Sequence, residues 1–154
     1  MVEIKRVNST DTDFIALVRL LDKELAERDG NDHSFYAQYN KIDLIRYCLV
    51  LYENKTPVSC GAIKELSSES TEVKRMYTLT GFRGKGYAQM ILTELEKWAQ
   101  ELGYKNCVLE TGKRQPEAIA LYKKCGYEII SNYGQYIGIE NSVCFQKKII
   151  HLHA

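Results

Sequence analysis

The sequence predicts an α/β (α+β) domain, in which one mixed, mostly antiparallel sheet carries helices on both faces. Two patterns predict this class. In the first half, strand-like segments follow one another with short turns between them, which is typical of antiparallel strands. In the second half, helical and strand-like segments alternate, which is typical of a sheet with helices packed on it. The chain has 154 residues, and we expect residues 1–154 to form a single domain.

The chain is expected to begin with a strand and a helix. Residues 2–7 alternate apolar and charged side chains, which predicts the strand. Thr10 or Asp11 can cap the helix that follows, in which apolar residues recur at helical spacing. This helix should end before the turn-forming cluster 29–32, and the polar-aromatic stretch 33–40 should form a short second helix.

Three strands and the strongest helix of the chain are expected next. Turn-forming polar residues separate the predicted strands, which span residues 44–52, 58–66 and 71–79. The helix at 86–102 carries its apolar residues along one face, so that face should pack on the sheet.

The remaining elements complete the sheet. A short strand is predicted at 106–109, followed by a helix at 116–125 that has a proline in its first turn. Gly126 is the expected left-handed terminator of this helix. The last two strands are predicted at 127–130 and 143–149.

The composition is that of an ordinary globular protein: 45% of the residues are hydrophobic and 27% are charged. The net charge is +1, so the basic excess typical of a nucleic-acid partner is absent. No apolar run approaches the roughly 20 residues of a membrane span. The first residues alternate instead of forming a signal-peptide core. We therefore expect a cytoplasmic protein without a membrane or nucleic-acid partner.

The five cysteines agree with that compartment. They are widely spaced without a CxxC pair, and an odd, scattered set fits neither a disulfide framework nor a zinc site. They are expected to be small buried side chains in the reduced state, and no metal site is predicted. His151 and His153, near the end of the chain, are weak evidence for a metal on their own.

The segment between the third of these strands and the strongest helix carries the chemistry. It reads Thr80-Gly81-Phe82-Arg83-Gly84-Lys85-Gly86-Tyr87-Ala88. Gly84 and Gly86 let the backbone approach a ligand without interference from a Cβ atom. The first amides of a helix lack intrahelical partners, and the helix dipole favours negative charge there. With Arg83 and Lys85 at its rim, this glycine turn is predicted to hold a phosphate group.

The spacing of the glycines decides which known phosphate-binding motif this segment matches. The P-loop pattern G-x-x-x-x-G-K-[ST] and the dinucleotide pattern G-x-G-x-x-G both fail here. The match is to R-x-x-G-x-A, from Arg83 through Gly86 to Ala88, which is the pyrophosphate-binding motif of the GNAT N-acetyltransferase superfamily. The run from Gln115 to Tyr127 resembles a second motif of that family, N-x-x-A-x-x-L-Y-x-x-x-G-[FY], with glutamine in place of the usual asparagine. Over essentially its whole length the chain resembles a small bacterial single-domain acetyltransferase.

The resemblance implies the GNAT acyl-CoA N-acyltransferase fold and a reaction. The acetyl group of acetyl-CoA, a cosubstrate, would move to a primary amine by direct attack in a ternary complex. In the family, the strand before the glycine turn has a bulge whose exposed amides hold the acetyl group and the pantetheine arm. The implied cofactor-binding residues are Met76, Tyr77, Thr78, Arg83, Gly84, Lys85, Gly86, Tyr87, Ala88 and Gln115.

Acetyl transfer needs a base that keeps the amine neutral and an acid that protonates the departing thiolate. The motif makes Tyr122 the candidate acid, since a phenol retains its proton at neutral pH. Glu72 is the leading candidate base, and alternation along its strand would place it on the same face as Met76. Glu110 is the competitor, and it would face the acceptor if its strand splays away from the preceding one. Either carboxylate could also be an ordinary solvated strand end.

The acceptor is less defined by the sequence. A small molecule is favoured because we expect no further domain that could dock a protein. The candidate substrate-binding residues are His33, Tyr133 and Tyr136. Acidic side chains near the expected pocket would favour a cationic amine: Asp29, Asp32, Glu69, Glu110 and Glu140. Two alternatives stay open, a non-catalytic acyl-CoA-binding regulatory domain and an acetyltransferase of protein amines, as does a homodimer.

Overall fold

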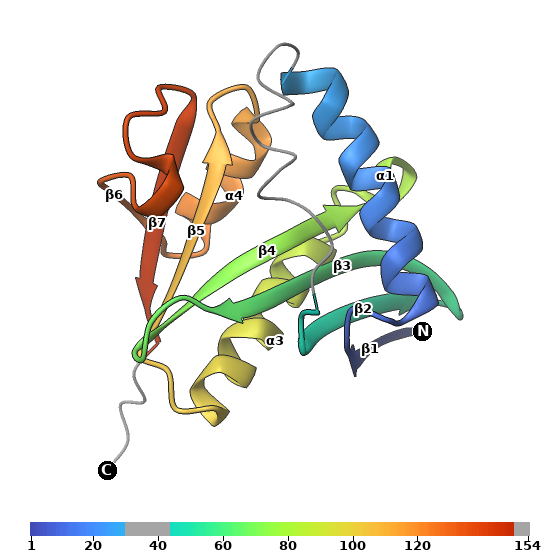
Figure 1. Cartoon of the computed structure of the whole chain (residues 1–154). Helices are drawn as coiled ribbons and strands as arrows, with labels where there is room; N and C mark the ends of the chain where they lie inside the picture. Colours follow the sequence, from blue (N-terminus) through green and yellow to red (C-terminus); the bar gives the residue numbers. More distant parts are fainter. Residues whose placement is uncertain (30–43, 150–154) are drawn as a thin grey trace.

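The computed structural model describes residues 1–29 and 44–149, apart from the side chains of Arg28 and Asp29. It confirms the predicted fold class, because one seven-stranded, mostly antiparallel sheet carries helices on both faces (Figure 1). The helix expected at 33–40 and the candidate residue His33 lie outside the described residues. Among the helices in the described part, none is long and apolar enough to cross a membrane.

The elements are β1 (Val2–Val7), α1 (Thr12–Asp29), β2 (Tyr47–Glu53), β3 (Thr56–Glu65), β4 (Ser70–Thr78), η2 (Thr80–Phe82), α3 (Tyr87–Glu101), β5 (Asn106–Gly112), α4 (Pro116–Lys124), β6 (Glu128–Ile130), η3 (Gly134–Tyr136) and β7 (Ser142–Lys148).

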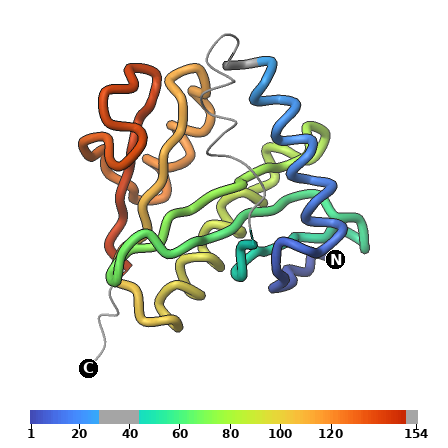
Figure 2. The backbone as a smooth tube through the Cα atoms, viewed as in Figure 1, coloured from blue at the N-terminus to red at the C-terminus, as the bar shows by residue number. Residues whose placement is uncertain are grey.

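The strands lie across the sheet in the order β1-β2-β3-β4-β5-β7-β6. Strands β1 to β4 pair antiparallel in chain order, as their short turns predict. Strands β4 and β5 are parallel, and their ladder joins Ser70–Glu72 to Asn106–Val108. Beyond this junction the two strands diverge (Figures 1 and 2), which confirms the expected splay.

Alternation along β2 assigns one apolar cluster to each face of the sheet. Leu49 and Leu51 belong to the cluster that α3 covers. Cys48 and Val50 belong to the cluster that α1 covers, where Phe14 is fully buried. Figure 1 shows α1 and α3 on opposite sides of the central strands. The two helices therefore cover opposite faces of the same central strands.

The two largest differences from the expected element boundaries are the start of β2 and the end of β5, and each follows from pairing with a distant part of the chain. β2 begins at Tyr47 because Ile45 is bonded elsewhere: its carbonyl accepts from the Ser9 amide at 2.9 Å, and its amide donates to the Ser9 hydroxyl at 2.9 Å. β5 continues past its expected end because Thr111 and Gly112 pair with β7. The longer β5 carries the chain to the site described below.

β4 contains the bulge that the family resemblance implies. Its register with β3 shifts between Cys60 and Ala62, so that Arg75 and Met76 lie opposite Gly61. Arg75 has a φ of 62°, in the left-handed region. A Cβ atom on Gly61 would lie 2.6 Å from the sulfur of Met76. Glycine at this position of β3 therefore makes room for the bulge on β4.

The bulge reverses the alternation of side chains along β4. Val73 and Met76 are an odd number of positions apart, yet both pack in the cluster beneath α3. A regular strand would place them on opposite faces. Glu72, the neighbour of Val73, therefore lies on the other face from Met76, and the expectation that these two side chains share a face is wrong.

Candidate active site

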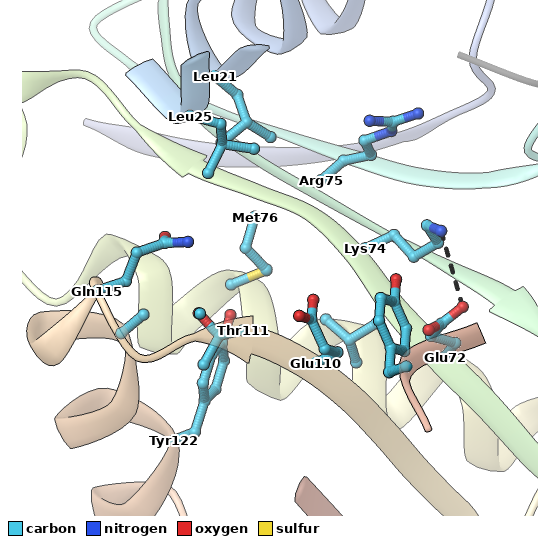
Figure 3. Close-up of a pocket in the computed structure, with 14 residues that line it drawn as sticks. Leu21, Leu25, Glu72, Lys74, Arg75, Met76, Glu110, Thr111, Gln115 and Tyr122 are labelled. Carbon is cyan, nitrogen blue, oxygen red and sulfur yellow. Dashed lines mark ion pairs between the residues drawn. The ribbon is translucent and has the colours of Figure 1, made fainter. Parts of the chain in front are cut away.

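A cavity of about 130 Å³ lies beside the diverging parts of β4 and β5 (Figure 3). It is lined by side chains and backbone from α1, β4, β5, α4 and η3, namely Leu21, Leu25, Glu72, Val73, Lys74, Arg75, Met76, Glu110, Thr111, Gly112, Gln115, Ala118, Tyr122 and Tyr136. The three residues predicted to be catalytic, Glu72, Glu110 and Tyr122, thus line one cavity.

The glycine turn has the backbone geometry that a phosphate group needs. Gly84 and Gly86 have φ angles of 82° and 83°, which favour glycine. A Cβ atom at either position would meet nothing within 4 Å, so both face open space. Gly86 is the N-cap of α3, whose first amides lack intrahelical partners. The turn therefore fits an anionic ligand at the start of α3.

The two cations of the turn are tied to the body of the protein. The Nε of Arg83 donates to the Thr78 carbonyl at 2.8 Å, and its guanidinium pairs with Glu24 of α1 at 2.9 Å. The ammonium of Lys85 pairs with Glu53 of β2 at 3.0 Å. These contacts hold the turn between α1 and β2, with positive charge at its rim.

The start of α3 is anchored in the same way. Tyr87 is buried, and its hydroxyl donates a hydrogen bond to Glu53. Hydrogen bonds from Tyr87 and Lys85 lower the pKa of the Glu53 carboxyl below its usual value. Ala88 is half-buried in the first turn of the helix. Tyr87 thus positions the helix start through its side chain, which leaves its backbone amide for any ligand contact.

Met76 of the bulge and the two residues after it differ in where their side chains lie. Met76 lines the cavity. The Tyr77 ring packs in the cluster covered by α1 and lies under the Arg83 guanidinium, 5.5 Å from its ring centroid. The Thr78 hydroxyl lies 2.8 Å from the hydroxyl of Ser59. Two of the three side chains are therefore occupied within the protein, as a role through backbone amides allows.

One face of α4 supplies the wall below the cavity. Gln115, Ala118 and Tyr122 recur at helical spacing and all line the cavity, as the sequence predicts for Gln115 and Tyr122. The Tyr122 ring is buried and packs against Tyr127 and Phe145, with ring centroids 5.9 Å away in each case. Burial, and then the charges of nearby groups, raise the Tyr122 pKa well above that of an exposed phenol. The phenol therefore retains its proton.

Glu72 is held from two sides. The Tyr133 hydroxyl donates to its Oε2 atom at 2.6 Å, and the Lys74 ammonium lies 3.8 Å from its Oε1 atom. Glu72 is 7% exposed. Burial, and then the charge of Glu72, raise the pKa of Tyr133. Tyr133, which the sequence suggested as a wall of the acceptor pocket, contacts a cavity-lining carboxylate instead.

Glu110 enters the cavity from β5. The Ser142 hydroxyl donates to its Oε2 atom at 2.7 Å, which fixes the carboxylate at the end of the strand. Tyr136 lines the cavity next to it and is 3% exposed. Burial, and then the charges of Glu110 and Glu72, raise the pKa of Tyr136. Of the two expected acceptor contacts within the described residues, Tyr133 and Tyr136, it is Tyr136 that lines the cavity.

The charge of the cavity differs from the sequence-based expectation. Among the acidic residues expected to favour a cationic amine, Glu110 lines the cavity, whereas Glu69 pairs with Lys105 at 3.0 Å on an exposed turn. Lys74 and Arg75 line the cavity and were missed. Two consecutive cations in a predicted central strand were the available signal, because charged side chains are rare in such strands.

Comparisons with known proteins agree with the fold. A family model described as Acetyltransferase (GNAT) family matches residues 14–127. The uncharacterized N-acetyltransferase YjgM of Escherichia coli is 37% identical over 112 residues, which cover 71% of this chain and 66% of YjgM, just under two-thirds. The IAA acetyltransferase of Azospirillum brasilense is 31% identical over 138 residues, 88% of this chain and 90% of the relative.

Solved structures with a similar fold include two acyltransferases. A Klebsiella pneumoniae protein described as an acyl-CoA N-acyltransferase superposes with a TM-score of 0.81 at 28% identity, covering 97% of this chain and 99% of the other. The PaiA N-acetyltransferase of Thermoplasma acidophilum, solved with coenzyme A, has a TM-score of 0.71 at 17% identity over 96% of this chain and 99% of its own. At this identity, the likeness to PaiA shows a shared fold alone.

Proposed function

The chain belongs to the acetyltransferase (GNAT) family, and we propose that residues 1–154 form one domain that transfers the acetyl group of acetyl-CoA to a primary amine of a small molecule. The observation that carries this proposal is the cavity beside β4 and β5, which is lined by the phenol of Tyr122 and the carboxylates of Glu72 and Glu110. The cytoplasmic location and the homodimer stay predictions.

Acetyl-CoA is the cosubstrate that the site fits. The open glycine turn and the start of α3 suit the pyrophosphate, since backbone amides and a helix dipole favour an anion there. The bulge of β4 interrupts the ladder with β3 and supports a role for the amides of Met76, Tyr77 and Thr78 in binding the acetyl arm. Gln115 lines the cavity at the start of α4, where the family motif carries asparagine.

In the proposed reaction the neutral amine attacks the thioester carbonyl. The new C–N bond forms, the C–S bond breaks, and the amine gives up a proton to a base. Tyr122 donates its phenolic proton to the departing sulfur, and its buried, protonated state suits this role. Backbone amides at the bulge would stabilise the negative charge that develops on the carbonyl oxygen.

The position of Glu110 on β5 supports it as the base, and Glu72 is the alternative. Both oxygens of Glu72 have protein partners, Tyr133 and Lys74, so its carboxylate is committed to the wall of the cavity. Glu110 is held by Ser142 and lies on β5, opposite the bulge. A base needs to reach the amine directly or through one water, and the side chain of Glu110 lines the cavity on that side.

Calorimetric titration with acetyl-CoA tests the proposal, with CoA, ATP and NAD as comparison ligands. We expect saturable micromolar binding of acetyl-CoA and none of ATP or NAD, followed by thiol release in the presence of an amine. Binding without thiol release for any small amine or lysine peptide would favour the non-catalytic acyl-CoA-binding domain. Release with a lysine peptide alone would favour a protein acceptor, and no binding by the folded protein would refute all three.

A further inference from the structure

We infer that the acceptor carries a carboxylate as well as its amine, and that Arg75 and Lys74 bind the carboxylate. The inference rests on the proposed acetyl transfer and names the class of acceptor for that site. The candidate acceptors are amino acids with an apolar side chain.

The first argument is the balance of charge around the cavity. Its lining contains two carboxylates, Glu72 and Glu110, and two cations, Lys74 and Arg75. A polyamine or another multiply charged cation would meet both positive groups, and like charges in a partly enclosed site repel. A zwitterion matches a lining that contains both signs.

The second argument is how these charges are arranged. Figure 3 shows Lys74 and Arg75 along β4, with Glu110 on β5 on the other side of the cavity. An amine beside Glu110 would therefore leave the rest of the acceptor directed toward β4. A carboxylate one carbon away from the amine would extend toward the two cations.

The third argument is the state of Arg75. Its side chain is 2% exposed, and its ion pair with Asp22 of α1 is long, at 3.9 Å. Its left-handed backbone, with a φ of 62°, is unfavourable for a residue other than glycine, so the bulge holds this side chain at the cavity wall against a conformational cost. A guanidinium in that position can form two parallel hydrogen bonds with a carboxylate.

Lys74 and the α1 leucines complete the proposed subsite. Lys74 is 11% exposed, and its 3.8 Å pair with Glu72 holds the ammonium at the cavity wall. Leu21 and Leu25 line the cavity from α1, and Figure 3 shows them on the same side as Arg75. An apolar side chain next to the carboxylate would pack on these leucines.

Matched pairs of acceptors test the inference. Alanine, leucine, methionine and phenylalanine are each compared with the corresponding primary amide by thiol release from acetyl-CoA. The amide keeps the size and the amine but removes the negative charge. Rates are compared at equal concentrations of neutral amine, because the two amines of a pair ionise differently. We expect kcat/KM to favour the amino acid by about tenfold or more in at least one pair.

Variants assign the preference to the two cations. Arg75→Gln should reduce the ratio of kcat/KM between acid and amide by about tenfold, whereas Arg75→Lys should retain part of it. Lys74→Gln provides a second test if the Arg75 variant folds poorly. Arg6→Gln is the matched control, since Arg6 forms exposed ion pairs with Glu94 and Glu101 and should leave the ratio unchanged.

The outcomes separate this inference from the proposed function. Equal rates within every pair, or a preference for the amides, would overturn the inference and leave acetyl transfer standing. A preference that survives both Arg75→Gln and Lys74→Gln would also overturn it. If acetyl-CoA fails to bind, both the inference and the proposed function are overturned.

Discussion

The two ends of the site are built from different parts of the chain. The cofactor end, which comprises the bulge, the glycine turn and the start of α3, comes from one continuous stretch and presents backbone. The acceptor end comprises Glu72, Lys74, Arg75, Glu110 and Tyr136, which come from three separate elements and present side chains. The difference predicts that the cofactor end is sensitive to changes in backbone conformation, and the acceptor end to changes in individual side chains.

The largest effect should follow a backbone change at the cofactor end. Gly86→Val should weaken acetyl-CoA binding by about 100-fold or more, because valine disfavours the φ of 83° and places a side chain in open ligand space. Gly103→Val is the matched control, with a φ of 93° and equally open surroundings after α3. Calorimetry and thermal unfolding should show similar losses of stability for both variants, but loss of binding for Gly86→Val alone. Equal binding losses would refute the assignment of the turn.

The next effect concerns Tyr122, the proposed general acid, whose side chain lines the cavity. Tyr122→Phe should lower kcat by about 100-fold with little change in acetyl-CoA affinity, since a general acid acts on the leaving thiolate. Tyr127→Phe is the control, because Tyr127 is also buried and its hydroxyl donates to Glu96 of α3 at 2.9 Å. That variant should lose about 1 kcal/mol of stability and keep its kcat. An unchanged kcat in Tyr122→Phe would exclude Tyr122 as the acid.

The pH dependence of the reaction should reflect the raised pKa of Tyr122. Because burial raises this pKa, the phenol stays protonated above the ordinary tyrosine value of about 10. Activity should therefore not fall through ionisation of Tyr122 as the pH rises from 8 to about 10. A fall in kcat with an apparent pKa below 10 that disappears in Tyr122→Phe would contradict the burial seen here.

The two carboxylates give a comparison within the acceptor end. Glu110→Gln should lower kcat by about 100-fold at neutral pH and move the pH profile toward alkaline values, where the amine loses its proton unaided. Glu72→Gln should have a smaller effect, about tenfold or less, because Glu72 is committed to Tyr133 and Lys74. The reverse order of effects would make Glu72 the base.

The smallest effect should come from a residue that acts on the site through another. Tyr133→Phe removes the 2.6 Å hydrogen bond to Glu72 and should change kcat/KM by about threefold to tenfold. Tyr104→Phe removes a hydroxyl that donates to Glu65 at an exposed position, and should leave kcat/KM unchanged. Equal effects of the two changes would show that Tyr133 contributes only packing.

The same contrast explains which features the sequence could predict. The glycine turn and the face of α4 with Gln115 and Tyr122 depend on local spacing, and the structure places them as predicted. The bulge depends on Gly61, on a neighbouring strand, and so the alternation from Glu72 to Met76 could not be read along β4 alone.

The acceptor end was predicted less well for the same reason. The contact between Tyr133 and Glu72 spans 61 positions in the chain, and that between Ser142 and Glu110 spans 32. No local pattern encodes such pairs. Arg75 was missed because its place on the cavity wall follows from the bulge, so an error in the register of one strand carried over to the chemistry of the site.

The short ladder between β4 and β5 has a consequence for the exchange of amide hydrogens with water. Amides at the junction, Ser70–Glu72 and Asn106–Val108, lie in paired strands and are protected while the sheet is intact. Past the junction, amides of β4 and β5 that point toward each other have no ladder bond between them. They should exchange quickly in the unbound protein and slow down when a ligand enters. The exchange rates of these individual amides thus report whether a ligand occupies the site, before any turnover takes place.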